Sequence, residues 1–156
     1  MRKQIVRSAI LAFVAVALLA MQNEKLPAVN SKIISYVDKV MGKKVDRGEC
    51  WDLVKYVLDS AHANWTAPDD FGKKLDPKKD VILPGDIVAL KNVKYKLENN
   101  SEWNFPKHYA VIYKVTDKEH YTMANQNVNG KRQVMFSDLS LIGLKGSITF
   151  FRPQAK

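Results

Sequence analysis

The chain has no means of forming an internal disulfide, because Cys50 is the only cysteine among its 156 residues. Its stability must therefore come from a hydrophobic core, and its length is that of a single compact domain. A cysteine that does not crosslink is either a small core residue or a reactive thiol. Both interpretations of Cys50 remain open on composition alone.

Arginine-rich stripes, which are typical of nucleic-acid binders, are also missing. The 25 basic residues are scattered among 16 acidic ones, so we expect no nucleic-acid partner. The positive excess instead favours a polyanionic neighbour such as a cell envelope. Repeats and low-complexity segments are absent, which indicates one domain. Closely spaced pairs of metal ligands are absent too, so we expect no metal and no other cofactor.

An apolar run at the amino terminus is too short to cross a membrane. Arg2, Lys3 and Arg7 precede uninterrupted apolar residues 9–20, whereas a spanning helix needs about 20 apolar residues. A basic start followed by a short apolar core and a small residue is typical of a signal peptide. We therefore predict a signal peptide over residues 1–20 and an exported, periplasmic or extracellular protein. Membrane contact is expected only if this segment stays uncleaved.

Helices are predicted in the first part of the remaining chain. Residues 21–29 are polar and indicate a linker, and residues 30–156 are predicted to form the domain. A first helix begins at a cap formed by Asn30 or Ser31. A second helix covers residues 49–62, where apolar side chains recur at i, i+3, i+4, i+7 and i+8.

Strands are predicted to follow the helices. The strongest hairpin signal is Asn129-Gly130, and Pro84-Gly85-Asp86 indicates a turn in which Asp86 caps backbone amides. The predicted polar loop covers residues 91–107, and the predicted strands cover residues 81–93, 108–115, 120–128, 133–136 and 147–152. This order is typical of an α+β domain with N-terminal helices packed on an antiparallel sheet. We expect a monomer.

Three polar residues fall where they can make a thiol reactive. Cys50 starts the second helix, whose N-terminus carries a partial positive charge that favours a thiolate. His108 starts a strand and is a candidate base, and an imidazolium beside the thiol would lower the thiol pKa further. Asn125 lies on the next strand, where an amide can orient the imidazole. The spacing permits this arrangement without requiring it. The remaining histidines, His62 and His120, are predicted to be exposed.

Four segments carry a family resemblance. In order, they are Gly48-Glu49-Cys50-Trp51-Asp52-Leu53, Pro84-Gly85-Asp86-Ile87-Val88, His108-Tyr109-Ala110-Val111-Ile112 and Asn125-Gln126-Asn127. Together they resemble the CHAP and NlpC/P60 superfamily of papain-like peptidases and amidases, which mostly cut peptide bonds in bacterial cell walls. The resemblance covers residues 29–153 and implies an NlpC/P60-type fold. It also implies Cys50 as nucleophile, His108 as base and Asn125 as the orienting group.

Two further residues are candidates for substrate binding. Asn127 matches a polar position often seen in CHAP sequences, which implies that it binds substrate or polarises its carbonyl. Trp103 lies in the predicted loop before His108, where it would line a groove together with Tyr95 and Phe105. A loop aromatic folded onto the sheet is the alternative for Trp103.

The sequence departs from the family pattern at Glu49, where CHAP sequences commonly have glutamine. A carboxylate there would repel a developing oxyanion and leave its stabilisation mainly to the backbone N–H of Cys50. A neutral Asn125 also stabilises an imidazolium less than a carboxylate would.

These features predict a cysteine hydrolase that cleaves amide or peptide bonds. Its expected partner is peptidoglycan or a cell-wall peptide. The departures from the family pattern keep a second hypothesis open, a non-catalytic cell-wall-binding or accessory module on the same fold. Acyl transfer to an amine or a lipid is a third hypothesis, and the sequence does not say which bond is cut.

Overall fold

The computed structural model describes residues 26–96 and 102–156, with the side chains of Tyr95 and Lys96 left out. The predicted signal peptide and most of the predicted linker lie outside the described residues. Two helices come first, α2 (Ala28–Val40) and α3 (Cys50–Ser60). Within the described part of the chain, no helix combines the length and the apolar character that a membrane span requires.

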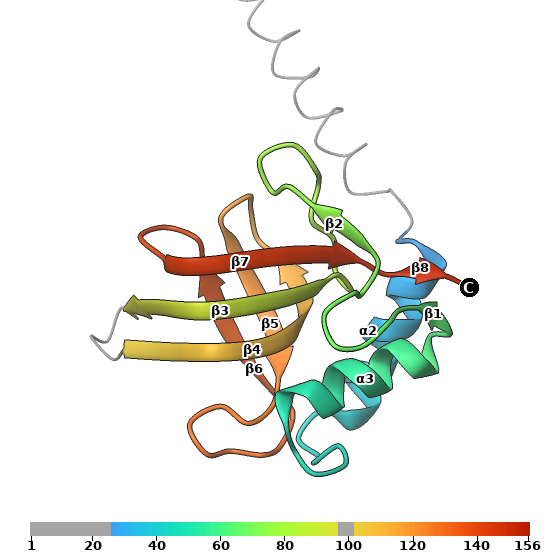
Figure 1. Cartoon of the computed structure of the whole chain (residues 1–156). Coiled ribbons are helices and arrows are strands. Elements are labelled where there is room, and N and C mark those ends of the chain that lie inside the picture. The colour runs from blue at the N-terminus through green and yellow to red at the C-terminus, as the bar shows by residue number, and fades with distance from the viewer. Residues whose placement is uncertain (1–25, 97–101) are drawn as a thin grey trace, which may run out of the picture.

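A six-stranded antiparallel sheet follows the helices in strand order β2-β7-β3-β4-β5-β6 (Figure 1). Its strands are β2 (Lys73–Leu75), β3 (Ile87–Lys96), β4 (Glu102–Val115), β5 (His120–Asn125), β6 (Met135–Ser140) and β7 (Lys145–Arg152). Two short strands, β1 (Ala63–Asn64) and β8 (Gln154–Ala155), pair separately. The predicted α+β class, with N-terminal helices packed on an antiparallel sheet, is confirmed.

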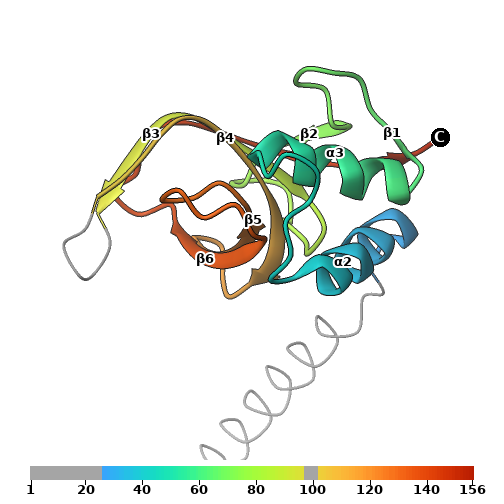
Figure 2. The same cartoon turned by 90° about the horizontal axis from the view of Figure 1, so that it is seen from below.

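The sheet curves strongly, so that β5 and β6 lie across from β3 and β4 (Figure 2). Over much of the sheet both faces are therefore buried, each in a different hydrophobic cluster. Tyr109 and Val111 of β4 face the helices, whereas Ala110 and Ile112 pack inside the curve. Strand residues buried on both faces give a continuous apolar run in place of a strict alternation. Burial on both faces explains why apolar residues follow one another directly after His108 in the sequence.

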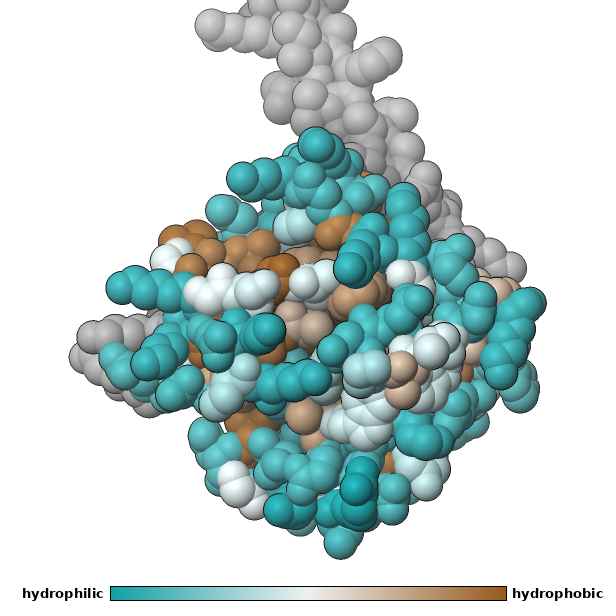
Figure 3. Space-filling model, viewed as in Figure 1, coloured by the Kyte–Doolittle hydropathy of each residue, from teal (hydrophilic) through white to brown (hydrophobic). Residues whose placement is uncertain are grey.

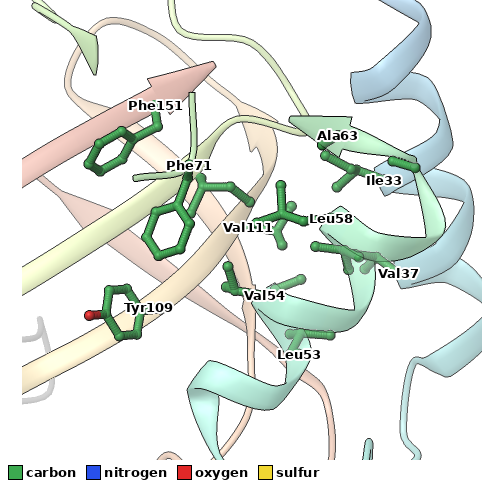
Figure 4. Packing of buried hydrophobic residues seen from close by; sticks show 14 of the residues in the cluster. Ile33, Val37, Leu53, Val54, Leu58, Ala63, Phe71, Tyr109, Val111 and Phe151 are labelled. Carbon is green, nitrogen blue, oxygen red and sulfur yellow. The ribbon is translucent and has the colours of Figure 1, made fainter. Parts of the chain in front are cut away.

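Helix α3 lies between α2 and the sheet (Figure 4). Its residues Leu53, Val54, Val57 and Leu58 are fully buried, as the helical spacing predicts. Burial of each such side chain contributes about 1.5–3 kcal/mol. This stripe fixes α3 against the sheet and thereby places the first turn of the helix next to β4.

Asn30 does not cap a helix, contrary to the prediction. Helix α2 begins earlier, at Ala28, with Pro27 at the N-cap position. The Asn30 side chain is buried, and its Nδ2 donates hydrogen bonds of 2.9 Å to the carbonyl of Pro84 and to Oδ1 of Asp86. A buried carboxylate requires such donors, and this tertiary demand outweighs the local preference for a cap.

The segment predicted as a polar loop, residues 91–107, is mostly strand. Strands β3 and β4 remain paired from Lys91↔Lys107 to Lys96↔Glu102. Val93 and Phe105 are buried opposite each other in this extension. The lysines between the apolar positions hid the alternation, and Trp103 therefore lies on a strand.

Asp86 caps the turn before β3, as predicted, and does more. It is fully buried, and its Oδ2 accepts hydrogen bonds of 2.8 Å from the Leu83 N–H and from Nη2 of Arg152. Gly85 has φ of 86°, and an added Cβ would lie 2.7 Å from Cα of Asn30. The Pro84-Gly85-Asp86 segment therefore joins the start of β3 to both α2 and β7.

The buried ion pair of Asp86 and Arg152 predicts a large stability loss for Asp86→Asn. The change leaves Arg152 without its carboxylate, and breaking a buried pair in this way costs about 3–5 kcal/mol. The free energy of unfolding in urea provides the measurement. As a matched control, Asp46→Asn on the surface should change it by less than about 0.5 kcal/mol. Equal effects of the two changes would contradict a structural role for Asp86.

Candidate active site

Cys50 lies where the pairing of β4 with β5 has not yet begun. The two strands pair from Val111↔Ala124 onward, which leaves the backbone N–H of Tyr109 free to hydrogen-bond to the Cys50 sulfur. The ring of Trp51 packs edge-on against the Tyr109 ring at 5.6 Å. Helix α3 is thus anchored to β4 by its first two residues.

Burial raises the pKa of the Cys50 thiol above its ordinary value, and the charge of Glu49 raises it further. The backbone N–H groups of Tyr109, Trp51 and Cys50 itself act in the opposite direction without reversing the shift. The sequence predicts a lowered thiol pKa from the helix N-terminus, and that prediction is wrong. Desolvation of a thiolate outweighs a partial charge at a helix end.

His108 is buried on β4, with its ring stacked on Phe105 at a centroid distance of 4.4 Å. Burial lowers the pKa of His108 to about 4, and the nearby Asn125 side chain opposes this shift only in part. The imidazole is therefore neutral at pH 7, and no imidazolium is present to lower the thiol pKa. The resting pair is a neutral thiol and a neutral imidazole.

Asn125 ends β5 and is fully buried. Its Nδ2 donates a 2.8 Å hydrogen bond to Oγ of Ser137 on β6. This contact fixes the orientation of the Asn125 amide. Oδ1 of Asn125 and Nε2 of His108 are both buried, and within the described part of the chain neither atom has a hydrogen-bond partner. Ser137 therefore orients the amide, a role that sequence reasoning missed.

Cys50 and His108 line one cavity of about 260 Å³. Trp103 and Asn127 line it as well, whereas Asn125 is not among the lining residues. The ring of Trp103 packs edge-on against Phe105 at 5.3 Å. The structure thus brings four of the five predicted site residues to a single cavity, and the fifth, Asn125, influences the pKa of His108.

The carboxylate of Glu49 is engaged on both oxygens. Arg132 donates to Oε1 at 2.5 Å, and Nδ2 of Asn127 donates to Oε2 at 2.6 Å. The arginine compensates part of the negative charge that the sequence places beside Cys50. Asn127 has φ of 60°, and its side-chain amide donates to Glu49. Arg132 is 83 residues from Glu49, and no local pattern indicates the pairing.

Gln126 is fully buried and binds the segment that leads into α3. Its Oε1 accepts a 3.2 Å hydrogen bond from the Val45 N–H, and its Nε2 donates to the carbonyls of Val45 at 3.0 Å and Glu49 at 2.7 Å. Sequence reasoning missed this role. One signal was available in the sequence. Gln126 stands between Asn125 and Asn127, and successive side chains of a strand point to opposite faces, so its side chain is expected on the other face from theirs.

The other two histidines lie at the surface, as predicted. Nδ1 of His120 is 2.9 Å from Oδ1 of Asp117, beside the turn before β5. Over residues 26–96 and 102–156, histidine, cysteine and acidic side chains do not gather into any group of three or more that would suit a metal ion.

The lowered pKa of His108 predicts a pH-dependent stability. The unfolded chain takes up a proton near pH 6.5, whereas the folded chain does so only near pH 4. Protonation therefore favours the unfolded state, and stability falls as the pH drops through this window. The loss is about 3 kcal/mol between about pH 7.5 and pH 4. Urea unfolding of wild type and His108→Gln measures it, and the variant should lack this component. His62→Asn, a change at an exposed histidine, should retain it.

The charge of Glu49 predicts opposite effects of two substitutions on Cys50. Glu49→Gln should lower the thiol pKa, because it removes a negative charge that disfavours the thiolate. Arg132→Met should raise it, because it leaves that charge uncompensated. The pH dependence of alkylation by iodoacetamide reports the pKa. Asp46→Asn serves as the control carboxylate, and identical profiles for all three variants would contradict this electrostatic assignment.

Two crystal structures of Ly7917 are similar to the chain, one of them determined with the hydrolyzing product of MDP. Each is 16% identical in sequence and covers 80% of this chain, with TM-scores of 0.53 and 0.52. The chain spans 62% of the length of these proteins. At this level of identity the likeness shows the fold alone. No curated protein matches the sequence.

A family model matches residues 20–156, which is most of the chain. The match includes both helices, the whole sheet and the cavity between Cys50 and His108. The fold is that of a papain-like cysteine proteinase, and the chain belongs to the AIM3/BBC1 cysteine proteinase-fold domain family.

Proposed function

We propose that the protein is a cysteine hydrolase that cleaves an amide or peptide bond. In this proposal Cys50 is the nucleophile, His108 the base and Asn125 the residue that orients the imidazole. One observation carries the proposal: the thiol and the imidazole line the same cavity, and the buried amide of Asn125 acts on the pKa of the imidazole. A nucleophile, a base and an orienting group are the parts that acyl transfer by a thiol requires.

The neutral resting state sets the order of proton transfers. In this proposal the Asn125 amide orients the imidazole, and one ring nitrogen of His108 faces the thiol. As Sγ of Cys50 bonds to the substrate carbonyl carbon, the thiol proton passes to His108. The carbon–nitrogen bond then breaks, and the leaving amine takes that proton. Water attacks the thioester with His108 again as base, which releases the acid and restores the thiol.

The developing oxyanion requires hydrogen-bond donors at the start of α3. The backbone N–H of Cys50 is at the helix N-terminus, where partial positive charge favours an anion. The Glu49 carboxylate is directed to Arg132 and Asn127, which reduces its repulsion of that oxyanion. Asn127 contributes by holding Glu49, and Trp103 forms a wall of the cavity against which substrate packs.

The proposed substrate is a peptide of the bacterial cell wall, and the proposed location is periplasmic or extracellular. The resemblance to CHAP and NlpC/P60 sequences supports this substrate, as does the Ly7917 structure with the hydrolyzing product of MDP. The basic character of the chain and the signal-like residues 1–20 support export toward an anionic envelope.

Peptidoglycan fragments test the hydrolase directly. Cys50→Ala should abolish hydrolysis, and His108→Ala should reduce kcat by about 10²-fold or more, because the base is lost. Ser137→Ala should lower kcat while leaving KM unchanged and should be milder than Asn125→Ala, because it only misorients the amide. His120→Ala, at an exposed histidine, is the matched control. Hydrolysis that survives Cys50→Ala would rule out this mechanism.

A non-catalytic wall-binding module is the second candidate. The raised thiol pKa and the Glu49 carboxylate beside the cavity favour it. It predicts peptidoglycan binding that survives both Cys50→Ala and His108→Ala. Mass spectrometry of the wild-type protein mixed with substrate distinguishes the two candidates, because only the hydrolase forms a thioester at Cys50.

A further inference from the structure

A second hollow lies on the sheet beside the Cys50 cavity. It has a volume of about 390 Å³ and opens on the face of β7, β3 and β4 that is turned toward the viewer in Figure 1. Lys107 lines both this hollow and the cavity that contains Cys50 and His108. A chain-like substrate that lies across Cys50 therefore reaches the second hollow past Lys107.

The strand register explains why this part of the sheet is hollow. One row across β7, β3 and β4 consists of Ser147, Lys91 and Lys107, and the next row consists of Thr149, Ala89 and Tyr109. The short side chains of Ser147, Thr149 and Ala89 form the bottom of the hollow, and the longer side chains of Lys91, Lys107 and Tyr109 rise beside them. Of these residues, Tyr109 packs against Trp51 of α3, and the surface around the hollow mixes hydrophilic and hydrophobic residues (Figure 3).

The hollow carries an excess of positive charge. Lys74, Lys91 and Lys107 line it, and Asp69 is its only acidic lining residue. The Asp69 carboxylate already has two partners. It accepts a hydrogen bond from the Tyr109 hydroxyl, and its Oδ1 lies 3.3 Å from Nζ of Lys107. Lys74 and Lys91 form no ion pair within the described part of the chain.

The pairing of Lys91 with Lys107 is unfavourable in the free protein. The two residues are directly opposite each other on β3 and β4, and like charges at such positions destabilise a sheet. Asp69 compensates one of them. An anion bound between the remaining ammonium groups would compensate the other and would find hydroxyl donors in Ser147 and Thr149.

We propose that this hollow is a substrate subsite that binds a carboxylate. It would make the protein prefer peptides that carry a free carboxyl group near the bond to be cut. The inference rests on the proposed hydrolase, because it names the class of peptide that the Cys50 cavity receives. Lys74 and Lys91 supply the charge, while Lys107 stays paired with Asp69.

Binding is measured in the Cys50→Ala background, where no turnover occurs. The probes are a muramyl tetrapeptide in its free-acid form and the same peptide with its carboxyl groups amidated. The acid form should bind about tenfold more tightly than the amide. This figure follows because two exposed ion pairs would form, and each contributes about fivefold or less to the affinity. The added change Lys74→Met with Lys91→Met should bring this ratio to about one. Lys114→Met, at an exposed lysine of β4 outside the hollow, should leave the ratio unchanged.

Each outcome separates the subsite from the hydrolase. Equal affinity for the acid and the amide overturns the subsite, and so does a preference that the double lysine change leaves intact. The subsite is also overturned if the hollow binds inorganic phosphate while the protein binds the acid and the amidated peptide equally well. Hydrolysis of both peptides at equal rates by the wild-type protein overturns the subsite but leaves the hydrolase standing. Lysine-dependent selectivity without hydrolysis supports the subsite and overturns the hydrolase.

Discussion

The buried side chain of Gln126 holds the segment from which helix α3 starts, and the geometry around Cys50 depends on this contact. Its amide binds both backbone groups of Val45 and the carbonyl of Glu49, and it supplies the buried Val45 N–H with an acceptor. The preceding residue, Asn125, points to the opposite face of the strand end and contacts His108. One end of β5 thus positions both the thiol-bearing helix and the imidazole.

Burial determines the electrostatics of the site more than any single charge does. It raises the thiol pKa of Cys50 and lowers the imidazole pKa of His108, so each group is kept in its neutral form. The pairing of Glu49 with Arg132 limits the negative charge next to the thiol. Under the proposed mechanism, proton transfer from sulfur to nitrogen therefore has to accompany attack on a substrate, because the two groups form no ion pair beforehand.

Local patterns predicted the parts of the fold that local forces determine. The apolar stripe of α3 and the turn at Asp86 follow from helical spacing and turn chemistry, and the cavity contains the cysteine and histidine that the motifs indicated. Predictions failed where distant segments decide the outcome: Asn30 serves a buried carboxylate, and the lysine-rich extension of β3 and β4 does not alternate clearly. Roles that depend on contacts across the fold, those of Gln126, Ser137 and Arg132, leave no periodic signal in the sequence.

The contact between Gln126 and Glu49 joins residues 77 positions apart, which has a consequence during protein synthesis. A ribosome completes α3 long before it adds the end of β5. Until then the segment before Cys50 lacks its buried amide partner, and His108 lacks Asn125. The buried surroundings that Cys50 and His108 share are therefore complete only after most of the sheet has been made.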